Sequence, residues 1–179
     1  CALPISFPPG SYYSSETGYP KKFFKIDEWK ETSPNPYLSF TKDSEIYESI
    51  RNVFTKAVHK RLLSDRPIGS LLSGGLDSSL IAALAAKHLA KRGKQLHTFS
   101  IGMPGSTDLF YAKLVAEHIS SIHHEILLTP DDFLKAIPHV VKDIESYDIT
   151  SVRASVGNWL IGRWIKQNTD IKVVFNGDG

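Results

Sequence analysis

Short apolar segments alternate with longer amphipathic segments along most of this chain, and this alternation constrains the fold more than any other feature. The short segments have strand length and lack polar alternation, as strands covered on both faces do; they are residues 68–72, 97–101, 124–128 and 171–175. The longer segments predict helices over residues 43–63, 78–92, 108–119, from 130 onward, and 151–167. Strands that alternate with helices pair in parallel through crossover connections. We therefore predict an α/β fold with an open, doubly wound parallel sheet.

The first part of the chain has a different composition. Residues 1–40 hold six of the ten prolines and show no helical period. Two short extended runs, 7–13 and 22–26, flank a polar turn over 14–18, which predicts a hairpin or linker without a core of its own. The composition changes at about Thr41, so we predict two regions, residues 1–40 and residues 41–179.

Charge and composition exclude several classes of protein. The 21 Lys and Arg against 19 Asp and Glu leave a net charge of +2, which excludes a basic body that binds nucleic acid without sequence preference. No apolar run approaches the roughly 18–20 residues that span a bilayer, and no secretory signal pattern occurs. Cys1 is the only cysteine, so an internal disulfide and a cysteine-based zinc site are excluded. We therefore expect a cytosolic protein with neither a nucleic-acid nor a membrane partner.

The segment Ser73-Gly74-Gly75-Leu76-Asp77-Ser78-Ser79 connects a predicted strand to an Ala/Leu-rich predicted helix. Glycines let an anion approach the backbone, and a helix N-terminus presents unpaired N–H groups to it. Asp77 would repel a bare phosphate, so we predict a magnesium ion between Asp77 and the phosphates. The lysine of the kinase-type phosphate loop is absent, because Gly75 stands in its place. The alternative is a plain Gly/Ser turn in which Asp77 only favours the helix start.

Two further glycine-rich segments follow predicted strands. Ser100-Ile101-Gly102-Met103-Pro104-Gly105 leaves the second strand, and Asn176-Gly177-Asp178-Gly179 leaves the last. Because ligands of open α/β sheets bind beyond the carboxyl ends of the strands, we expect these segments near the 73–79 loop. Each segment taken alone is typical of a plain turn.

Residues 147–153 lead into the last predicted helix and include its first residues. Thr150 or Ser151 is predicted to cap it, as Ser106 or Thr107 is predicted to cap the helix over 108–119. Arg153 then falls in the first turn, where a cation opposes the helix dipole and suits a carboxylate or phosphate ligand. A surface salt bridge is the alternative for Arg153.

The sequence pattern does not favour a zinc site at the three histidines His118, His123 and His124. No matching carboxylate or thiolate arrangement accompanies them, and neighbouring residues of a strand point to opposite faces.

Four of these segments together, in the same order, resemble the glutamine-dependent asparagine synthetases: residues 71–79, 100–103, 147–155 and 174–179. The first segment alone is shared by the wider class of ATP pyrophosphatases, the PP-loop class, and residues 147–155 narrow the resemblance. Residues 7–13 are similar to the segment that closes the family's amino-terminal glutaminase domain. The resemblance therefore implies that residues 1–40 end that domain and form a linker. Residues 41–179 would then begin the synthetase domain.

The resemblance also implies a reaction. ATP adenylates the β-carboxylate of aspartate with release of pyrophosphate, and ammonia from glutamine then attacks β-aspartyl-AMP. The implied nucleotide and pyrophosphate contacts are Leu72, Ser73, Gly74, Gly75, Ser78, Ser79, Ile101, Asn176 and Gly177, with Asp77 on magnesium. Thr150 and Arg153 would orient aspartate or pyrophosphate, and Asp178 would help form the adenylate. Cys1 is not the family's nucleophile, because the residues after it do not match.

The chain departs from the family at its end. The family's Ser-Gly-Glu-Gly is Asn-Gly-Asp-Gly here, which makes Asp178 one methylene shorter and changes its reach by about 1 Å. The chain starts without Met and stops directly after an apolar run, which indicates a piece of a longer protein. A second magnesium aspartate and a later lysine of the family lie beyond Gly179, so we expect this piece alone to be inactive.

Two other functions stay open at this point. One is a PP-loop ligase acting on another carboxylate, such as a β-lactam synthetase. The other is a nucleotide-binding piece without catalysis. A homodimer is likewise left open.

Overall fold

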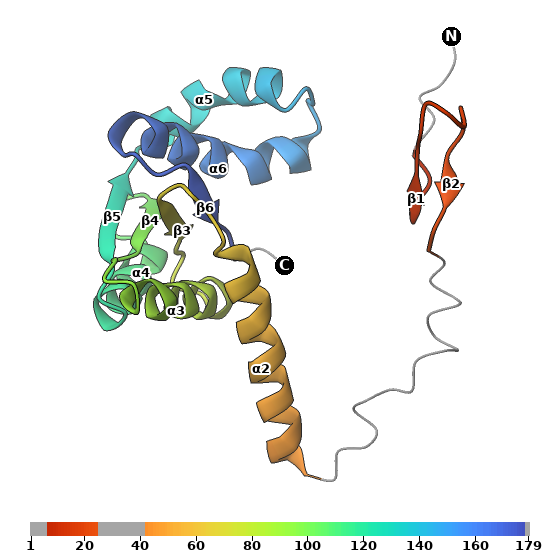
Figure 1. The fold of residues 1–179 in the computed structure, drawn as a ribbon. Coiled ribbons are helices and arrows are strands. Elements are labelled where there is room, and N and C mark those ends of the chain that lie inside the picture. The colour runs from red at the N-terminus through yellow and green to blue at the C-terminus, as the bar shows by residue number, and fades with distance from the viewer. Residues whose placement is uncertain (1–6, 25–41, 178–179) are drawn as a thin grey trace. The chain divides into compact units, whose positions relative to one another are not determined.

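The computed structural model describes residues 7–24 and 42–177 (Figure 1). The chain divides into two compact units, Cys1–Arg51 and Asn52–Gly179, and each is described by itself. Within the described residues, every helix is too short or too polar to cross a membrane.

The first unit contains the predicted hairpin. Strand β1 (Ser11–Tyr12) pairs antiparallel with β2 (Lys21–Lys22). The Gly18 backbone N–H donates to the Ser14 carbonyl at 3.1 Å and closes the turn between the strands. The hairpin is thereby confirmed, while residues 25 and 26, predicted to continue its second run, lie outside the described residues.

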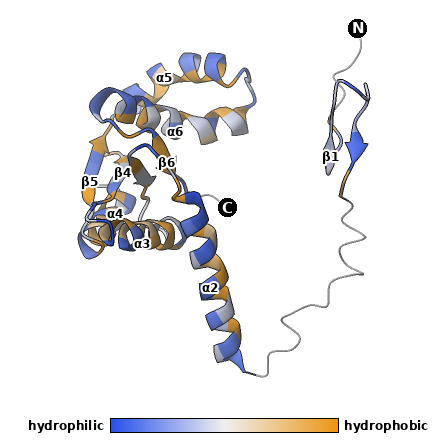
Figure 2. Ribbon diagram, viewed as in Figure 1, coloured by the Kyte–Doolittle hydropathy of each residue, from blue (hydrophilic) through white to orange (hydrophobic). Residues whose placement is uncertain are grey.

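The second unit is built on a four-stranded parallel sheet with the strand order β5-β4-β3-β6. Its strands are β3 (Ile68–Leu71), β4 (His97–Gly102), β5 (Ile122–Leu127) and β6 (Val173–Phe175). All three strand pairs are parallel, which confirms the predicted sheet. In Figure 2, β6 and much of α3 are hydrophobic, whereas β5 carries a hydrophilic stretch in its middle.

Helices cover both faces of the sheet (Figure 1). They are α3 (Leu76–Ala90), α4 (Thr107–His118), α5 (Pro130–Asp143) and α6 (Ile149–Asn168). A further helix, α2 (Asp43–Arg61), crosses the boundary between the two units, and its Val58 joins the core. One core cluster packs α3 and α4 residues such as Ala82 and Ala112 against Leu72. A second cluster packs Ile161 and Ile165 of α6 against Phe99 on the other face. Two cores on opposite faces make the sheet doubly wound.

The strand order places a switch point beside β3. From β3 the chain moves outward to β4 and β5 through α3 and α4, then returns through α5 and α6 to place β6 on the other side of β3. In open α/β sheets the crevice at such a reversal, beyond the carboxyl ends of the strands, is where ligands bind.

Several element boundaries differ from the prediction by two residues, and capping explains the difference at the start of α6. The predicted cap of α6, Thr150 or Ser151, is wrong: Asp148 is the N-cap, and its Oδ2 accepts the Ser151 N–H at 2.8 Å. The helix therefore begins at Ile149, two residues early, and Arg153 lies beyond its first turn rather than in it. Helix α3 likewise begins two residues early, at Leu76.

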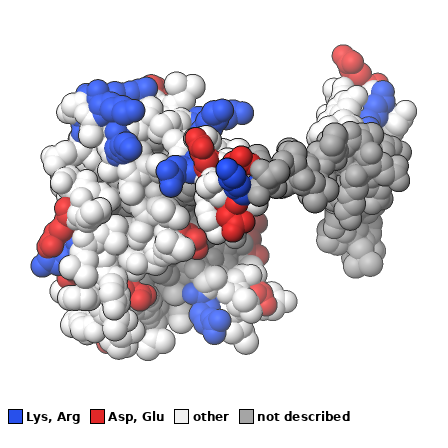
Figure 3. Space-filling view, turned by 90° about the horizontal axis from the view of Figure 1, so that it is seen from below, with Lys and Arg blue, Asp and Glu red and all other residues white. Residues whose placement is uncertain are grey.

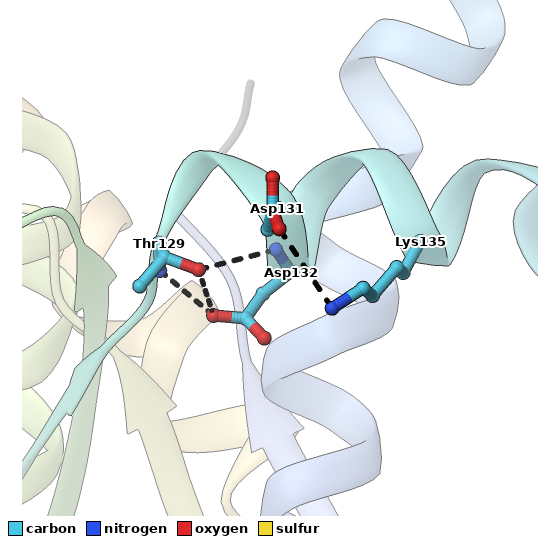
Figure 4. A network of polar contacts seen from close by, with 4 residues as sticks. All are labelled: Thr129, Asp131, Asp132 and Lys135. Carbon is cyan, nitrogen blue, oxygen red and sulfur yellow. Dashed lines mark hydrogen bonds and ion pairs between the residues drawn. The ribbon is translucent and has the colours of Figure 1, made fainter.

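Helix α5 begins with a complete capping box (Figure 4). The Thr129 hydroxyl accepts the Asp132 N–H at 3.4 Å, and Asp132 Oδ2 accepts the Thr129 N–H at 2.8 Å and its hydroxyl at 2.6 Å. These bonds from Thr129 lower the pKa of Asp132. Asp131 also pairs with Lys135 at 3.8 Å. Each bond joins residues no more than four apart, so this helix start is defined locally.

Charge on the second unit is mixed. In Figure 3, Lys and Arg stand in separate groups, with Asp and Glu between them. No continuous basic stripe crosses that face.

Candidate functional site

A cavity of about 250 Å³ opens at the carboxyl ends of β3, β4 and β6, beside the switch point. It is lined by Leu71, Leu72, Ser73, Gly75, Asp77, Ser78, Phe99, Ser100, Ile101, Asp108, Leu109, Asn158, Ile161, Asn176 and Gly177. Segments that leave three different strands therefore meet in one cavity, as the sequence predicted.

The 73–79 loop is held by its own serines. The Ser73 and Ser78 hydroxyls are 2.9 Å apart, and the Ser73 backbone N–H donates to Ser78 Oγ at 3.3 Å. The Gly75 N–H donates to Ser73 Oγ at 3.4 Å. Ser78 is buried, whereas Ser73 and Gly75 are exposed. These bonds bring the loop back onto the first turn of α3.

The N-terminus of α3 has no side-chain cap. Its N-cap is Gly75, in extended backbone and with no side chain to accept a first-turn N–H. The Ser79 hydroxyl donates to the Gly75 carbonyl at 2.6 Å and so offers no cap either. First-turn N–H groups without an internal acceptor at the edge of a cavity form a ready site for an anion.

Two glycines allow close backbone approaches at this site. Gly74 has φ +81°, and a Cβ there would lie 2.6 Å from the Ala112 nitrogen of α4. A Cβ on Gly177 would lie 2.6 Å from the Ser78 Cα. Gly74 thus seats the loop on α4, and Gly177 brings the end of β6 against the first turn of α3.

Two carboxylates from different helices line the cavity. Asp77 is the second residue of α3 and Asp108 is the second residue of α4, and both are exposed. Carboxylate oxygens are hard ligands of the kind magnesium takes, usually together with water and phosphate oxygens. In the described part of the chain, no group of three or more His, Cys, Asp or Glu could hold a metal ion by itself. Two lining carboxylates fit a magnesium ion whose other ligands would be water and the oxygens of a bound phosphate.

Sequence reasoning missed several lining residues. Asp108 has the same place in its helix as Asp77, so that shared position was the available signal. Asn158 and Ile161 come from the middle of α6, where the sequence pattern indicated only core packing. The remaining missed residues are Leu71, Phe99, Ser100 and Leu109.

Not every predicted site residue lines the cavity. Gly74 and Ser79 belong to the loop but lie outside the lining. Thr150 and Arg153 are exposed near the start of α6 and are also outside the lining. Asp178 lies outside the described residues. The roles given to Thr150, Arg153 and Asp178 stay predictions.

The parallel sheet with a Ser/Gly loop at its switch point defines an α/β domain of the PP-loop class. A solved structure with this fold is an NH3-dependent NAD synthetase from Campylobacter jejuni, determined in complex with a nitrate ion. The alignment has a TM-score of 0.51 and 15% identity, and it covers 74% of this chain and 57% of that chain. At that identity the likeness concerns the fold alone.

Sequence comparison identifies the family. The family profile described as "Asparagine synthase" matches residues 49–179, and the chain belongs to this family. The chain is 42% identical to a glutamine-hydrolyzing asparagine synthetase of Zea mays over 100% of its own length, and 49% identical to the Homo sapiens protein of that name over 75%. It spans 30% of the length of the maize protein and 24% of the human one.

Proposed function

We propose that the protein carrying this chain makes asparagine from aspartate, ATP and glutamine-derived ammonia, by way of β-aspartyl-AMP and pyrophosphate. One observation carries the proposal: a Ser/Gly loop opens onto an uncapped helix start at the switch point, in a chain of the asparagine synthase family. The maize and human relatives are named glutamine-hydrolyzing asparagine synthetases.

The cavity gives the two halves of ATP different surroundings. First-turn N–H groups of α3 and the hydroxyl of Ser73 would hold the pyrophosphate half. Leu72 and Ile101, at the ends of β3 and β4, would contact the nucleoside half. During adenylation negative charge grows on the leaving pyrophosphate, and N–H groups fixed beforehand stabilise it without rearranging.

Asp77 and Asp108 would hold the magnesium ion that accompanies ATP. When bound there, the ion would neutralise charge on the phosphate oxygens.

Three further roles follow from the family resemblance. Thr150 and Arg153 would orient aspartate, since a guanidinium binds a carboxylate through two parallel hydrogen bonds. Asp178 would assist adenylate formation. A glutaminase domain in the same cytosolic protein would supply the ammonia.

The test is product analysis with the full-length protein, ATP, magnesium and a panel of amino acids. We expect AMP and pyrophosphate in equal amounts, released only with aspartate, and asparagine when ammonia or glutamine is added. Release of ADP, or release that does not depend on aspartate, would contradict the proposal.

A further inference from the structure

A chain of side-chain hydrogen bonds leads from the cavity into the protein along β4 and β5. Ser100, which lines the cavity, has its Oγ 3.2 Å from His123 Nε2, and His123 Nδ1 lies 2.9 Å from Thr98 Oγ1. Thr98 Oγ1 is 2.8 Å from Ser121 Oγ, whose hydroxyl donates to the Ala116 carbonyl at 3.3 Å. Four hydrogen bonds thus join Ser100 to a backbone carbonyl of α4.

The donor and acceptor of each of these four hydrogen bonds follow from the last acceptor, the Ala116 carbonyl. A carbonyl can only accept, so the Ser121 hydrogen goes to Ala116 and the Thr98 hydrogen must go to Ser121. Thr98 then accepts from His123 Nδ1–H. With a neutral imidazole, Nε2 has no hydrogen and accepts from the Ser100 hydroxyl. Four bonds use the four available hydrogens, and any other arrangement leaves one bond unmade.

The surroundings of His123 favour the neutral ring. Burial lowers the pKa of His123, and the neighbouring His124 and Lys113 lower it further, whereas Glu125 raises it. Lys113 faces it from α4, and the other two lie on β5 itself. Its partners on β4, Thr98 and Ser100, are both buried and uncharged.

We propose that His123 is a positioning residue that holds Ser100 as a hydrogen-bond acceptor toward the cavity, where Ser100 selects a donor group of the nucleoside. The inference rests on the proposed function, in which a nucleotide fills the cavity. A phosphate oxygen has no hydrogen to donate to Ser100, so the Ser100 end disfavours phosphate, whereas the N–H groups of α3 favour it. The two ends together fix the direction in which the nucleotide lies.

The first test reads the His123 ring directly. Long-range ¹H–¹⁵N NMR of the full-length protein labelled with ¹⁵N-histidine, at pH 8, distinguishes the two tautomers. Loss of one signal set in His123→Asn assigns the ring. We expect the Nδ1–H tautomer, and a Nε2–H tautomer would overturn the proposal.

The second test measures KM for ATP and for three analogues that each lack one donor: inosine triphosphate, 2′-deoxy-ATP and 3′-deoxy-ATP. We expect KM of the unaltered protein to be about tenfold higher for one analogue than for ATP, because a tenfold ratio corresponds to the free energy of about one hydrogen bond. In Ser100→Ala, which removes the acceptor, this ratio of KM values should fall to near one. It should also fall in His123→Asn, which keeps a donor for Thr98 but no longer accepts the Ser100 hydrogen.

The control is His118→Asn, at the exposed end of α4 and outside the cavity lining, which should keep the discrimination. Unchanged discrimination in both Ser100→Ala and His123→Asn, with ATP turnover intact, would overturn the role of His123. Absence of ATP-dependent turnover in the unaltered protein would instead refute the proposed function, and the NMR test would still stand.

Discussion

The four helix starts that follow α2 fall into two pairs. Helices α3 and α4 begin at the cavity, and neither N-cap residue, Gly75 or Ser106, makes a side-chain cap bond. Helices α5 and α6 begin away from the cavity lining, and Thr129 and Asp148 cap them. A capped start uses its N–H groups for stability, whereas an open start keeps them for a ligand. The capped helix starts therefore stabilise the fold, whereas the open starts would bind a ligand.

The largest expected effect is a loss of activity when an aspartate at an open helix start is replaced by alanine, compared with the same replacement at a capped start. Asp77 and Asp131 are each the second residue of their helix, at an open and a capped start respectively. We expect Asp77→Ala to lower aspartate-dependent AMP release at least about 100-fold, because the magnesium ion that neutralises the leaving pyrophosphate would lose a protein ligand.

The matched variant, Asp131→Ala, should leave AMP release unchanged. Each substitution should lower the free energy of unfolding by only about 0.5 kcal/mol, the usual effect of a first-turn acid. Equal activity losses in the two variants, measured in the full-length protein, would break the comparison.

A second prediction concerns the glycine that seats the open start on α4. Gly74→Ala should lower the free energy of unfolding by about 2–4 kcal/mol, because φ is +81° and a Cβ would collide with the Ala112 nitrogen. Gly93 also has a positive φ, +68°, but nothing lies within 4 Å of a Cβ there. Gly93→Ala should therefore cost only about 1 kcal/mol. Denaturant unfolding of the two variants checks this, and equal losses would show that backbone strain alone matters.

A third prediction removes the cap from a capped helix start and adds one to an open start. Thr129→Ala removes the capping box of α5 and should cost about 1 kcal/mol of unfolding free energy without changing KM for ATP. Gly75→Ser fits, since a Cβ would meet only Ser73 Oγ at 3.4 Å, and it would add a cap to α3. Stability should rise by a few tenths of a kcal/mol while KM rises severalfold, because the new hydroxyl competes for the N–H groups. An unchanged KM would show that these N–H groups do not bind the nucleotide.

The smallest expected effect is a pH dependence of the capped start. Hydrogen bonds from the Thr129 hydroxyl and backbone lower the pKa of Asp132 below its usual 3.8. The folded state therefore favours the ionised form. The stabilisation is complete above pH 3.8 and is lost as pH falls through the lower, folded value. Between pH 5 and pH 2 the unaltered protein should lose more stability than Asp132→Asn, as measured by urea unfolding, and parallel curves would contradict this.

Much of the fold follows from local patterns. The apolar strands and the hairpin involve residues close together in the sequence, and the structure confirms both. The capping box at Thr129 is equally local. The start of α6 was predicted wrongly because several residues in a row can cap a helix. Asp148 reaches the Ser151 N–H, so Thr150 and Ser151 lie inside the helix.

The site is only partly visible in the sequence. The 73–79 loop and the exits at Ile101 and Gly177 were predicted to meet, because parallel strands end at one edge of a sheet. Asn158 was not predicted, because its place in the cavity depends on how α6 lies over the sheet. The bond between Ser100 and His123 was also hidden, because it requires the register that pairs β4 with β5.

The amino-acid sequence alone determined the order of strands and helices, the loop chemistry and the family, since these depend on residue types and short spacings. Only the tertiary structure decided which helix starts lack a side-chain cap and which second carboxylate lines the cavity with Asp77. It also decided that position 74 requires a glycine. Those properties arise where segments distant in the sequence come within a few ångströms. Strand order and helix packing, rather than local preference, set such approaches.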